Sequence, residues 1–284
     1  MPTKPQIAIV GPGRLGGALS LALTEAGYRV SEVISHDTPS SEKRARDIAR
    51  KTRSFTTTLK TANLDSDLIW FCVPDREIAR AARALIRSAE WKGKVAFHSS
   101  GALASDELNV LRRRGAAVAS VHPMMTFVRG SIPSLKGVTF ALEGDVKATR
   151  LARKITRDLG GNAFSISKTN KIAYHAWGGF SSPLLVALLV TAERVAKAAG
   201  LSAAQARKIM LPIVRQTLAN YGALGPSGAF SGPIVRGDVS IVRKHVRTLR
   251  KIPRAEEVYV ALARAALQYL PSRNRKKLGK LLAL

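Results

Sequence analysis

A glycine-rich turn near the amino terminus constrains the fold of this chain more than any other feature. The short apolar run 7–10 is followed at once by Gly11-Pro-Gly-Arg-Leu-Gly16. Apolar side chains then recur at helical spacing until Gly27, so the turn joins a strand to a helix. In that context G-x-G-x-x-G is typical of a dinucleotide-binding turn: the first glycine permits the tight turn, the second lets a diphosphate approach the backbone, and the third lets the helix pack closely. A glycine turn without any ligand is the alternative.

Strand and helix patterns alternate along the first part of the chain. The predicted strands are residues 7–10, 28–34, 67–73, 94–97, 117–121, 138–142 and 163–166. Helical patterns lie between them at 76–88, 105–114 and 146–159. This alternation predicts an α/β fold with a mostly parallel sheet of the Rossmann type over residues 1–167.

The strand patterns stop there, and residues 168–284 are predicted to form an all-helical domain. One long helix is expected over 171–199, a second from a capping box of Ser202 and Gln205 to about Tyr221, a third capped by Asp238, and a fourth over 254–270. Residues 222–237, rich in glycine and proline, are expected to be a loop. The apolar run 184–192 falls short of the roughly 20 residues that span a bilayer, so a buried helix is predicted and no membrane contact.

The chain is strongly basic, with a formal charge of +27. Residues 1–158 carry 26 Lys and Arg against 15 Asp and Glu, and residues 159–284 carry 20 against 4. No nucleic-acid motif accompanies these charges, so we expect no specific nucleic acid partner and a field that attracts anionic cofactors and substrates. The single cysteine, Cys72, excludes an intramolecular disulfide, and the start of the chain lacks the pattern of a signal peptide. A cytoplasmic location is therefore expected.

The second strand predicts which dinucleotide binds. An NAD site usually places an acidic residue at the end of this strand, whereas here the sequence reads Ile34-Ser35-His36 and Asp37 comes later. Ser35 could bind a 2′-phosphate, and His36, Lys43 and Arg44 could neutralise it, so NADP is favoured and NAD stays possible. The expected cofactor-binding residues are Gly11, Gly13, Arg14, Leu15, Gly16, Ser35, His36, Val73, Pro74 and Ser99.

Three further stretches follow predicted strands at the edge where open α/β sheets bind ligands. They are Cys72-Val-Pro-Asp-Arg-Glu-Ile78, His98-Ser-Ser-Gly-Ala102 and Val121-His-Pro-Met-Met-Thr-Phe127. Together with Gly232-Pro-Ile-Val-Arg-Gly-Asp238, they resemble a family of short-subunit dehydrogenase-like oxidoreductases that join a Rossmann-like domain to a helical domain of unknown function. That family is similar to pyrroline-5-carboxylate reductases and to the 6-phosphogluconate dehydrogenase group. The resemblance implies a homodimer formed through the helical domain, which closes over the cofactor cleft.

The 6-phosphogluconate dehydrogenase group carries Lys-x-x-x-Asn on the first helix of its second domain. Lys171-x-x-x-His175 has this spacing with histidine in place of asparagine. Residues four apart share one helix face, so Lys171 could polarise a carbonyl or imine while His175 exchanges a proton. A solvated lysine and a packed core histidine are the alternative. The resembling family also carries an asparagine after its Tyr-His pair, whereas this chain reads Phe180-Ser-Ser-Pro183 after Tyr174-His175.

His122, which precedes a proline as in prephenate dehydrogenases, is a further candidate proton donor, with a structural imidazole as the alternative. Ser100 and Arg236 are the expected substrate-binding residues, because an arginine can hold a carboxylate with two hydrogen bonds. The histidines show no metal-ligand spacing, so no metal site is predicted. The sequence therefore favours an NADP-dependent oxidoreductase that transfers a hydride to or from a small anionic substrate. A dinucleotide-binding regulator without turnover and an enzyme of the prephenate dehydrogenase type are the alternatives.

Overall fold

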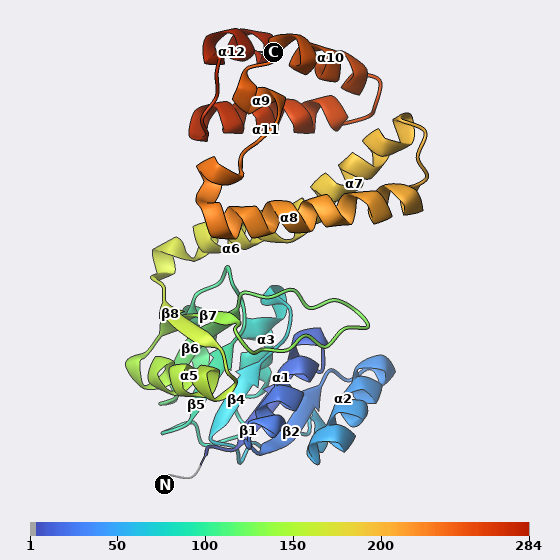
Figure 1. The fold of residues 1–284 in the computed structure, drawn as a ribbon. Helices are drawn as coiled ribbons and strands as arrows, with labels where there is room; N and C mark the ends of the chain where they lie inside the picture. Colours follow the sequence, from blue (N-terminus) through green and yellow to red (C-terminus); the bar gives the residue numbers. More distant parts are fainter. Residues whose placement is uncertain (1–3, 284) are drawn as a thin grey trace. The chain divides into compact units, whose positions relative to one another are not determined.

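The computed structural model describes residues 4–283 and forms two compact units, Met1–Gly179 and Phe180–Leu284. The first unit contains every strand found in the described residues, and the second is helical (Figure 1). The predicted α/β fold followed by a helical region is therefore confirmed.

One eight-stranded sheet forms the centre of the first unit. Its strands are β1 (Ile7–Val10), β2 (Val30–Ser35), β3 (Phe55–Thr58), β4 (Leu68–Phe71), β5 (Val95–His98), β6 (Ala117–Pro123), β7 (Thr139–Gly144) and β8 (Asn162–Ser165). They lie in the order β3-β2-β1-β4-β5-β6-β7-β8, and all neighbours are parallel except β6 and β7. The chain direction across the sheet reverses between β1 and β4, which is where a Rossmann sheet opens a crevice at the carboxyl ends of its strands.

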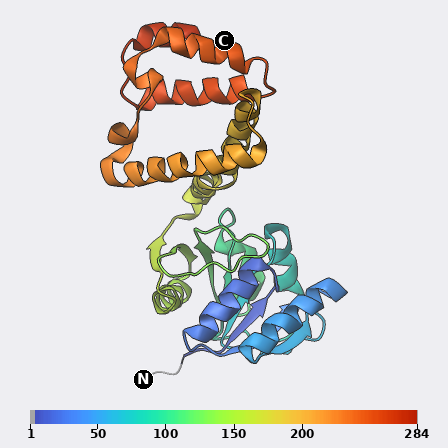
Figure 2. The ribbon, with the colours of Figure 1, turned by 45° about the vertical axis from the view of Figure 1, so that its right-hand side comes forward.

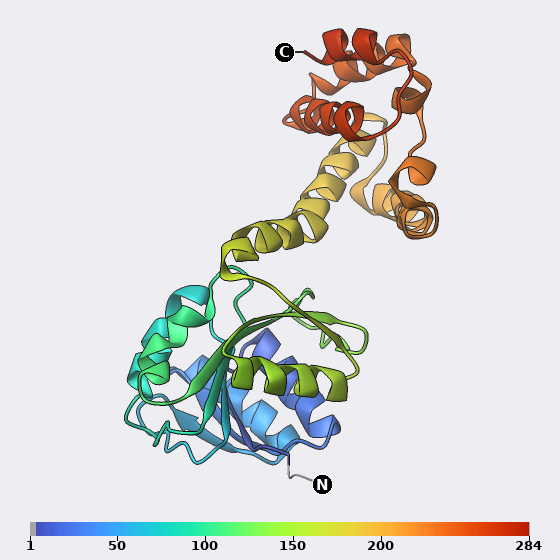
Figure 3. The same cartoon turned by 90° about the vertical axis from the view of Figure 1, so that its left-hand side faces the viewer.

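Helices cover both faces of this sheet, as Figure 3 shows. One face packs against α1 (Arg14–Glu25), α2 (Pro39–Thr52) and α5 (Val146–Asp158), and the other against α3 (Asp75–Ala84), the short 3₁₀ turn η1 (Ser105–Leu108) and α4 (Asn109–Arg112). Successive side chains of a strand alternate between the faces, so Ile7 and Ile9 belong to the first core and Ala8 and Val10 to the second. Both layers are needed because the central strands are buried throughout.

The sequence patterns did not predict α2 or β3. The buried positions of α2 are Ser41, Ala45, Ala49 and Thr52, which are small or polar and give no apolar periodicity. Strand β3 is short, lies at the sheet edge and exposes Phe55. Periodicity reports burial of large apolar side chains, and neither element buries one.

The second unit contains six helices within its described residues. They are α7 (Pro183–Ala198), α8 (Ala203–Ala229), α9 (Pro233–Arg236), α10 (Val239–Leu249), α11 (Ala255–Tyr269) and α12 (Arg275–Leu282). A compact core joins α10, α11 and α12, the cluster coloured from orange to red in Figure 2. The capping box of Ser202 and Gln205 at the start of α8 is confirmed, and so are helices close to the third and fourth predicted positions.

Proline and glycine chemistry alters the predicted helix boundaries. The single helix expected over 171–199 is two helices, α6 (Lys171–Ser181) and α7, which are interrupted at Ser182 because Pro183 disfavours helical backbone in the preceding residue. The predicted loop over 222–237 is wrong for most of its length. Helix α8 runs to Ala229 with one break at Gly225, where φ is +69°, and α9 covers Pro233–Arg236. Helix α12 was not predicted.

The prediction that α7 is a buried helix is wrong for the single chain. No residue of α7 is buried, and α8 buries only Ala206. Length and composition alone would let Lys168–Ala198 pass as a membrane span, which is weak evidence because core helices of other proteins pass the same test. These two helices therefore leave apolar side chains uncovered.

Candidate active site

The three glycines of the first turn have different roles. Gly11 has a φ of +102°, and a Cβ there would lie 2.7 Å from the carbonyl oxygen of Cys72. A Cβ on Gly16 would lie 2.0 Å from the carbonyl oxygen of Gly11. At Gly13 the nearest atom would be 3.9 Å away, so this position faces open space. The first and third glycines are thus required by packing, and the second leaves room for a ligand.

The amino terminus of α1 is suited to bind an anion. No side chain caps the helix at Gly13, and no acidic residue lies in its first turn. The N–H groups of that turn have no intrahelical acceptors, and they lie at the positive end of the helix dipole. The Arg14 guanidinium donates to the carbonyl of Phe127 at 3.1 Å, and Leu15 packs against the core, so both residues can offer their backbone N–H groups.

The end of β2 carries the groups expected to select the dinucleotide. Ser35 is buried, and its hydroxyl donates to the carbonyl of Thr57 at 3.3 Å, which directs it away from solvent. The backbone N–H of His36 donates to the Ser41 hydroxyl at 3.2 Å. Asp37 forms an ion pair with Lys60 at 2.5 Å, a cation that the sequence motifs did not identify.

The turn after β4 lies against the glycine turn. A Cβ on Gly11 would come within 2.9 Å of the Val73 side chain, and Pro74 caps α3. The Ser99 hydroxyl accepts a hydrogen bond from the Trp70 indole at 2.8 Å, so the structure uses it to fix the sheet edge. Burial raises the pKa of the Cys72 thiol to about 12, which keeps it neutral.

The loop after β5 is held rigidly by buried polar groups. The His98 Nε2 lies 2.9 Å from the carbonyl oxygen of Ala104, and its Nδ1 accepts from the backbone N–H of Ser100 at 3.1 Å. Burial lowers the pKa of His98 to about 4, so the ring is neutral. The Ser100 hydroxyl accepts from the N–H groups of Ala102 and Leu103, and this occupies the group expected to bind substrate.

The ammonium group of Lys171, at the start of α6, binds this loop. Lys171 is only 1% exposed. The ammonium donates to the Ser120 hydroxyl at 2.7 Å and to the Ser100 carbonyl at 3.2 Å. Burial lowers the pKa of Lys171 to about 8, against the opposing influence of Glu143 and Asp75.

Two further rings of α6 surround His122 at the end of β6. The Tyr174 hydroxyl lies 2.8 Å from the His122 Nδ1, and the ring centroids of His122 and His175 are 6.3 Å apart. A Cβ on Gly101 would lie 2.9 Å from the His122 Nε2 and 2.8 Å from the His175 Cδ2, so only glycine fits between these rings. Burial, reinforced by the charge of Lys171, lowers the pKa of His122 to about 4, and burial raises that of Tyr174 to about 12.

The structure thus gathers Lys171, His175, His122 and Ser100 at the sheet edge that also carries the glycine turn. Arg236 lies in the second unit, where its guanidinium binds the carboxylate of Asp238 at 2.9 Å. Asp238 does precede α10 but forms no capping hydrogen bond there. Sequence analysis gave no role to Tyr174, Ser120 or Gly101, although it named Tyr174 in the Tyr-His pair and included Gly101 in the stretch 98–102. Tyr174 was detectable, because it lies three residues after Lys171 and therefore on the same helix face.

Two domain families match the chain. Residues 1–123 match a Rossmann-like domain, and residues 138–266 match a domain of unknown function, DUF2520. The second match begins at β7, so it includes the last two strands of the sheet together with most of the helical unit. No curated protein is significantly similar in sequence.

Solved structures share the fold over nearly the whole chain. A protein from Bacteroides fragilis described as a candidate NADP oxidoreductase is 23% identical with a TM-score of 0.76, covering 92% of this chain and 97% of its own. A Thermotoga maritima protein is also 23% identical, with a TM-score of 0.72 and coverages of 96% and 98%. A reductive aminase from Aspergillus terreus, in complex with NADPH and ethyl-5-oxohexanoate, is 15% identical with a TM-score of 0.69 and coverages of 98% and 99%.

The different packing of the glycines leads to a first prediction. Gly16→Ala should lower the free energy of unfolding by several kcal/mol, roughly 3 or more, because the new methyl group meets a backbone carbonyl that cannot move aside. Gly13→Ala should change it by less than about 1 kcal/mol, since its backbone is extended and its surroundings are open. Urea unfolding measures both values, and equal losses in the two variants would contradict this account.

Burial of Lys171 leads to a second prediction. The unfolded chain keeps this proton up to its ordinary pKa of 10.5, whereas the folded chain releases it above about 8, so the lysine makes stability rise with pH in that window. Between pH 7 and pH 10.5 the stability of the wild type should therefore gain about 3 kcal/mol relative to Lys171→Met. Denaturant unfolding at both pH values tests this. Lys168→Met, which removes an exposed lysine paired with Asp106, is the control. The prediction would be contradicted if the difference in unfolding free energy between the wild type and Lys171→Met were the same at both pH values.

Proposed function

We propose that the protein is an NADP-dependent oxidoreductase that transfers a hydride between the nicotinamide and a small anionic substrate. The observation that carries the proposal is the open, uncapped start of α1 beside Gly13, at the crevice between β1 and β4. His122 and His175 lie at the same sheet edge and can exchange protons there. The fold is shared with a structure that contains NADPH, which supports the same cofactor class.

The residues around the crevice fit a dinucleotide. The backbone N–H groups of Arg14, Leu15 and Gly16 would bind the diphosphate, with Val73 and Pro74 lining the adjoining wall. His36 and Lys60 would attract a 2′-phosphate, as would the exposed Lys43 and Arg44 of α2. When bound, the nicotinamide would donate or accept the hydride, and the protein would supply orientation and the proton.

An anionic substrate suits the electrostatics of the chain. The net charge of +27 creates an attractive field. We propose that Arg236 binds the substrate carboxylate in place of Asp238, its present partner. The buried, neutral thiol of Cys72 is consistent with a protein of a reducing compartment such as the cytoplasm.

Nucleotide calorimetry tests the proposal. NADPH should bind the wild type more tightly than NADH, because the groups after β2 include several cations and one paired acid. Gly13→Ala should weaken NADPH binding at least about 10-fold, since its methyl group would occupy space beside the diphosphate. Gly17→Ala is the matched control: a Cβ there makes ordinary contact with Ile48 at 3.4 Å, so binding should be retained.

Absence of binding by either nucleotide would reject the proposal, and tighter binding of NADH would reject the choice of NADP. Turnover separates the remaining possibilities. Oxidation of NADPH by a keto acid, semialdehyde or cyclic imine would identify an enzyme, and activity on prephenate or arogenate would identify the prephenate dehydrogenase type. Tight binding without turnover across this set would instead indicate a regulator.

We further propose that the active protein is a homodimer formed through the helical unit. The chain exposes 16736 Å². Accessible surface scales with mass in globular proteins. Two separate globular proteins with the masses of the two units would together expose about 14,000 Å². The excess, about 2,700 Å², is in the range of an obligate interface. Uncovered apolar side chains on α7 and α8 supply such a surface, for example Val186, Val190 and Ile213 at 58%, 47% and 67% exposure.

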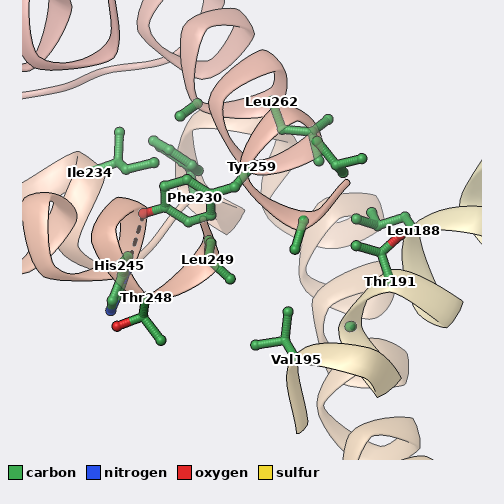
Figure 4. A pocket seen from close by; sticks show the side chains of 14 residues that line it. Leu188, Thr191, Val195, Phe230, Ile234, His245, Thr248, Leu249, Tyr259 and Leu262 are labelled. Atoms are coloured by element: carbon green, nitrogen blue, oxygen red, sulfur yellow. Dashed lines mark hydrogen bonds between the residues drawn. The ribbon is translucent and has the colours of Figure 1, made fainter. Parts of the chain in front are cut away.

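A cavity of about 540 Å³ in the helical unit would form part of this proposed interface (Figure 4). Its walls come from one face of α7, with Leu188, Thr191 and Val195, and from α10 and α11, with residues such as Leu249 and Leu262. The cavity is open and its lining is largely apolar, so in an isolated chain these apolar side chains would contact water. An apolar helix from a second copy of the chain, α7 or α8, has the matching chemistry.

Light scattering on a sizing column tests the dimer. The wild type should have about twice the 30.5 kDa mass of one chain at micromolar concentration. Val190→Arg should shift it to the monomer, because a charge in an apolar interface costs several kcal/mol. Val146→Arg is the matched control, since Val146 is 72% exposed on α5 of the first unit. A monomeric wild type would reject the dimer and leave the oxidoreductase proposal standing.

A further inference from the structure

We propose that Tyr174 and His122 form a proton relay that ends at the His122 Nε2, and that Lys171 is a positioning residue beneath it which does not touch substrate. This inference rests on the proposed oxidoreductase function. It assigns a role to Tyr174, to which the sequence gave none, and it changes the role that the Lys-x-x-x-His spacing suggested for Lys171.

The hydrogen bond between Tyr174 and His122 fixes the imidazole tautomer. The phenol is 6% exposed and stays protonated in the neutral range, because burial raises its pKa to about 12. Among the described residues its oxygen has one hydrogen-bonding partner, the His122 Nδ1 at 2.8 Å. If Nδ1 carried the ring proton, the buried phenol proton would have no acceptor, at a cost of about 1–3 kcal/mol. Tyr174 therefore donates, and His122 carries its proton on Nε2.

The surroundings of Gly101 leave that Nε2–H available to a ligand. The absent Cβ of Gly101 would lie 2.9 Å from Nε2, so any larger residue would cover the donor. The loop cannot shift to close this gap, because His98 and the Ser100 hydroxyl bind its backbone on both sides of Gly101. His122 is itself only partly buried, which a proton donor requires.

Lys171 acts on this pair through charge and through the loop. Lys171 is 1% exposed, and its ammonium donates to the Ser100 carbonyl and the Ser120 hydroxyl. These two hydrogen bonds keep the ammonium away from a bound substrate. Burial lowers the pKa of His122 most, and the positive charge of Lys171 lowers it further. His175 on α6 and His98 on β5 also interact electrostatically with this ring, and Glu143 and Asp75 interact with the ammonium. The imidazole is thereby kept neutral and holds a single proton, on Nε2.

The relay balances in the direction of reduction with NADPH as the reductant. As the carbon of a C=O or C=N group receives the hydride, the π-electron pair moves to the heteroatom, which takes the proton from the His122 Nε2. The Nδ1 atom then takes the phenol proton of Tyr174. The phenolate then takes its proton back from Nδ1 as Nε2 takes a proton from water, which restores the starting tautomer. Transfer is favourable because a phenol is a stronger acid than the alcohol or amine formed.

Nitrogen NMR of the full-length protein without nucleotide tests the tautomer directly. Two-bond ¹H–¹⁵N correlation spectra at pH 7 should show His122 with its proton on Nε2, and Tyr174→Phe should convert this to a mixture of tautomers. The chain offers a matched control, because Tyr259 and His245 form a second pair with the same perpendicular rings and a 3.1 Å contact. Tyr259→Phe should leave the His122 signals unchanged. A proton on Nδ1 in the wild type, or no response to Tyr174→Phe, would overturn the relay.

The same spectra test the role of Lys171. Lys171→Met should raise the pH at which His122 titrates from about 4 toward its ordinary value near 6.5, and Lys171→Arg should restore the low value because it restores the charge. Lys171→Gln replaces the methionine variant if the latter does not fold. An unchanged His122 titration in a folded, uncharged variant would overturn the positioning role.

Kinetics distinguish a failed relay from a failed function. Tyr174→Phe and His122→Gln should lower kcat about 100-fold while the Kd for NADPH stays at the wild-type value. Full activity in both variants overturns the relay but supports the oxidoreductase. Loss of NADPH binding in the wild type would overturn the proposed function, whereas the NMR result on the nucleotide-free protein would still decide the tautomer.

Discussion

The attachment of α6 to the sheet edge by one buried ammonium is the contact on which the candidate active site depends. Lys171 joins the loop after β5 to β6 through the Ser100 carbonyl and the Ser120 hydroxyl. The next helical turn then places Tyr174 against His122, and His175 beside Gly101. A buried lysine is costly unless it is hydrogen-bonded. Here the cost is offset by two acceptors and by the fields of Glu143 and Asp75. Lys171 therefore fixes the position of α6 relative to the edge of the sheet.

The strand order explains why the glycine turn and a pair of imidazoles lie along one edge of the sheet. Parallel strands all present their carboxyl ends at the same edge, so the turns after β1, β4, β5 and β6 lie along one line. The glycine turn offers uncapped N–H groups at one end of this line, and His122 lies three strands away at the other. An extended ligand with an anionic centre and a reactive end suits this spacing better than a compact one. The antiparallel β7 ends the line, because its carboxyl end lies at the opposite edge.

The sequence predicted those parts of the fold whose physics is local. The glycine turn, every strand except β3 and the capping box of Ser202 were predicted because each depends on neighbours within a few residues. Pro183 also carried a local signal, and its disruption of the long helix could have been predicted. The side-chain partnerships could not be: nothing near Ser35 in sequence shows that its hydroxyl binds Thr57, and nothing near Lys171 shows that its ammonium lies below Ser100. Such contacts join residues separated by 22 and 71 positions, and they decide which polar groups stay available to a ligand.

The apolar side chains of α7 are exposed in the single chain, although the sequence predicts a buried helix. The run from 184 to 192 is too apolar for water, and burial was expected within the chain. The structure covers one face of α7 loosely, with Leu188 and Val195 at the wall of an open cavity, while Val186 and Val190 on other sides remain exposed. The hydrophobic effect specifies that such side chains be covered but does not specify by which chain. The like charges of two copies oppose association, yet screening at physiological salt limits that repulsion to about 8 Å, whereas apolar contacts persist. The proposed homodimer would cover α7 and so reconcile its apolar sequence with its exposure in one chain.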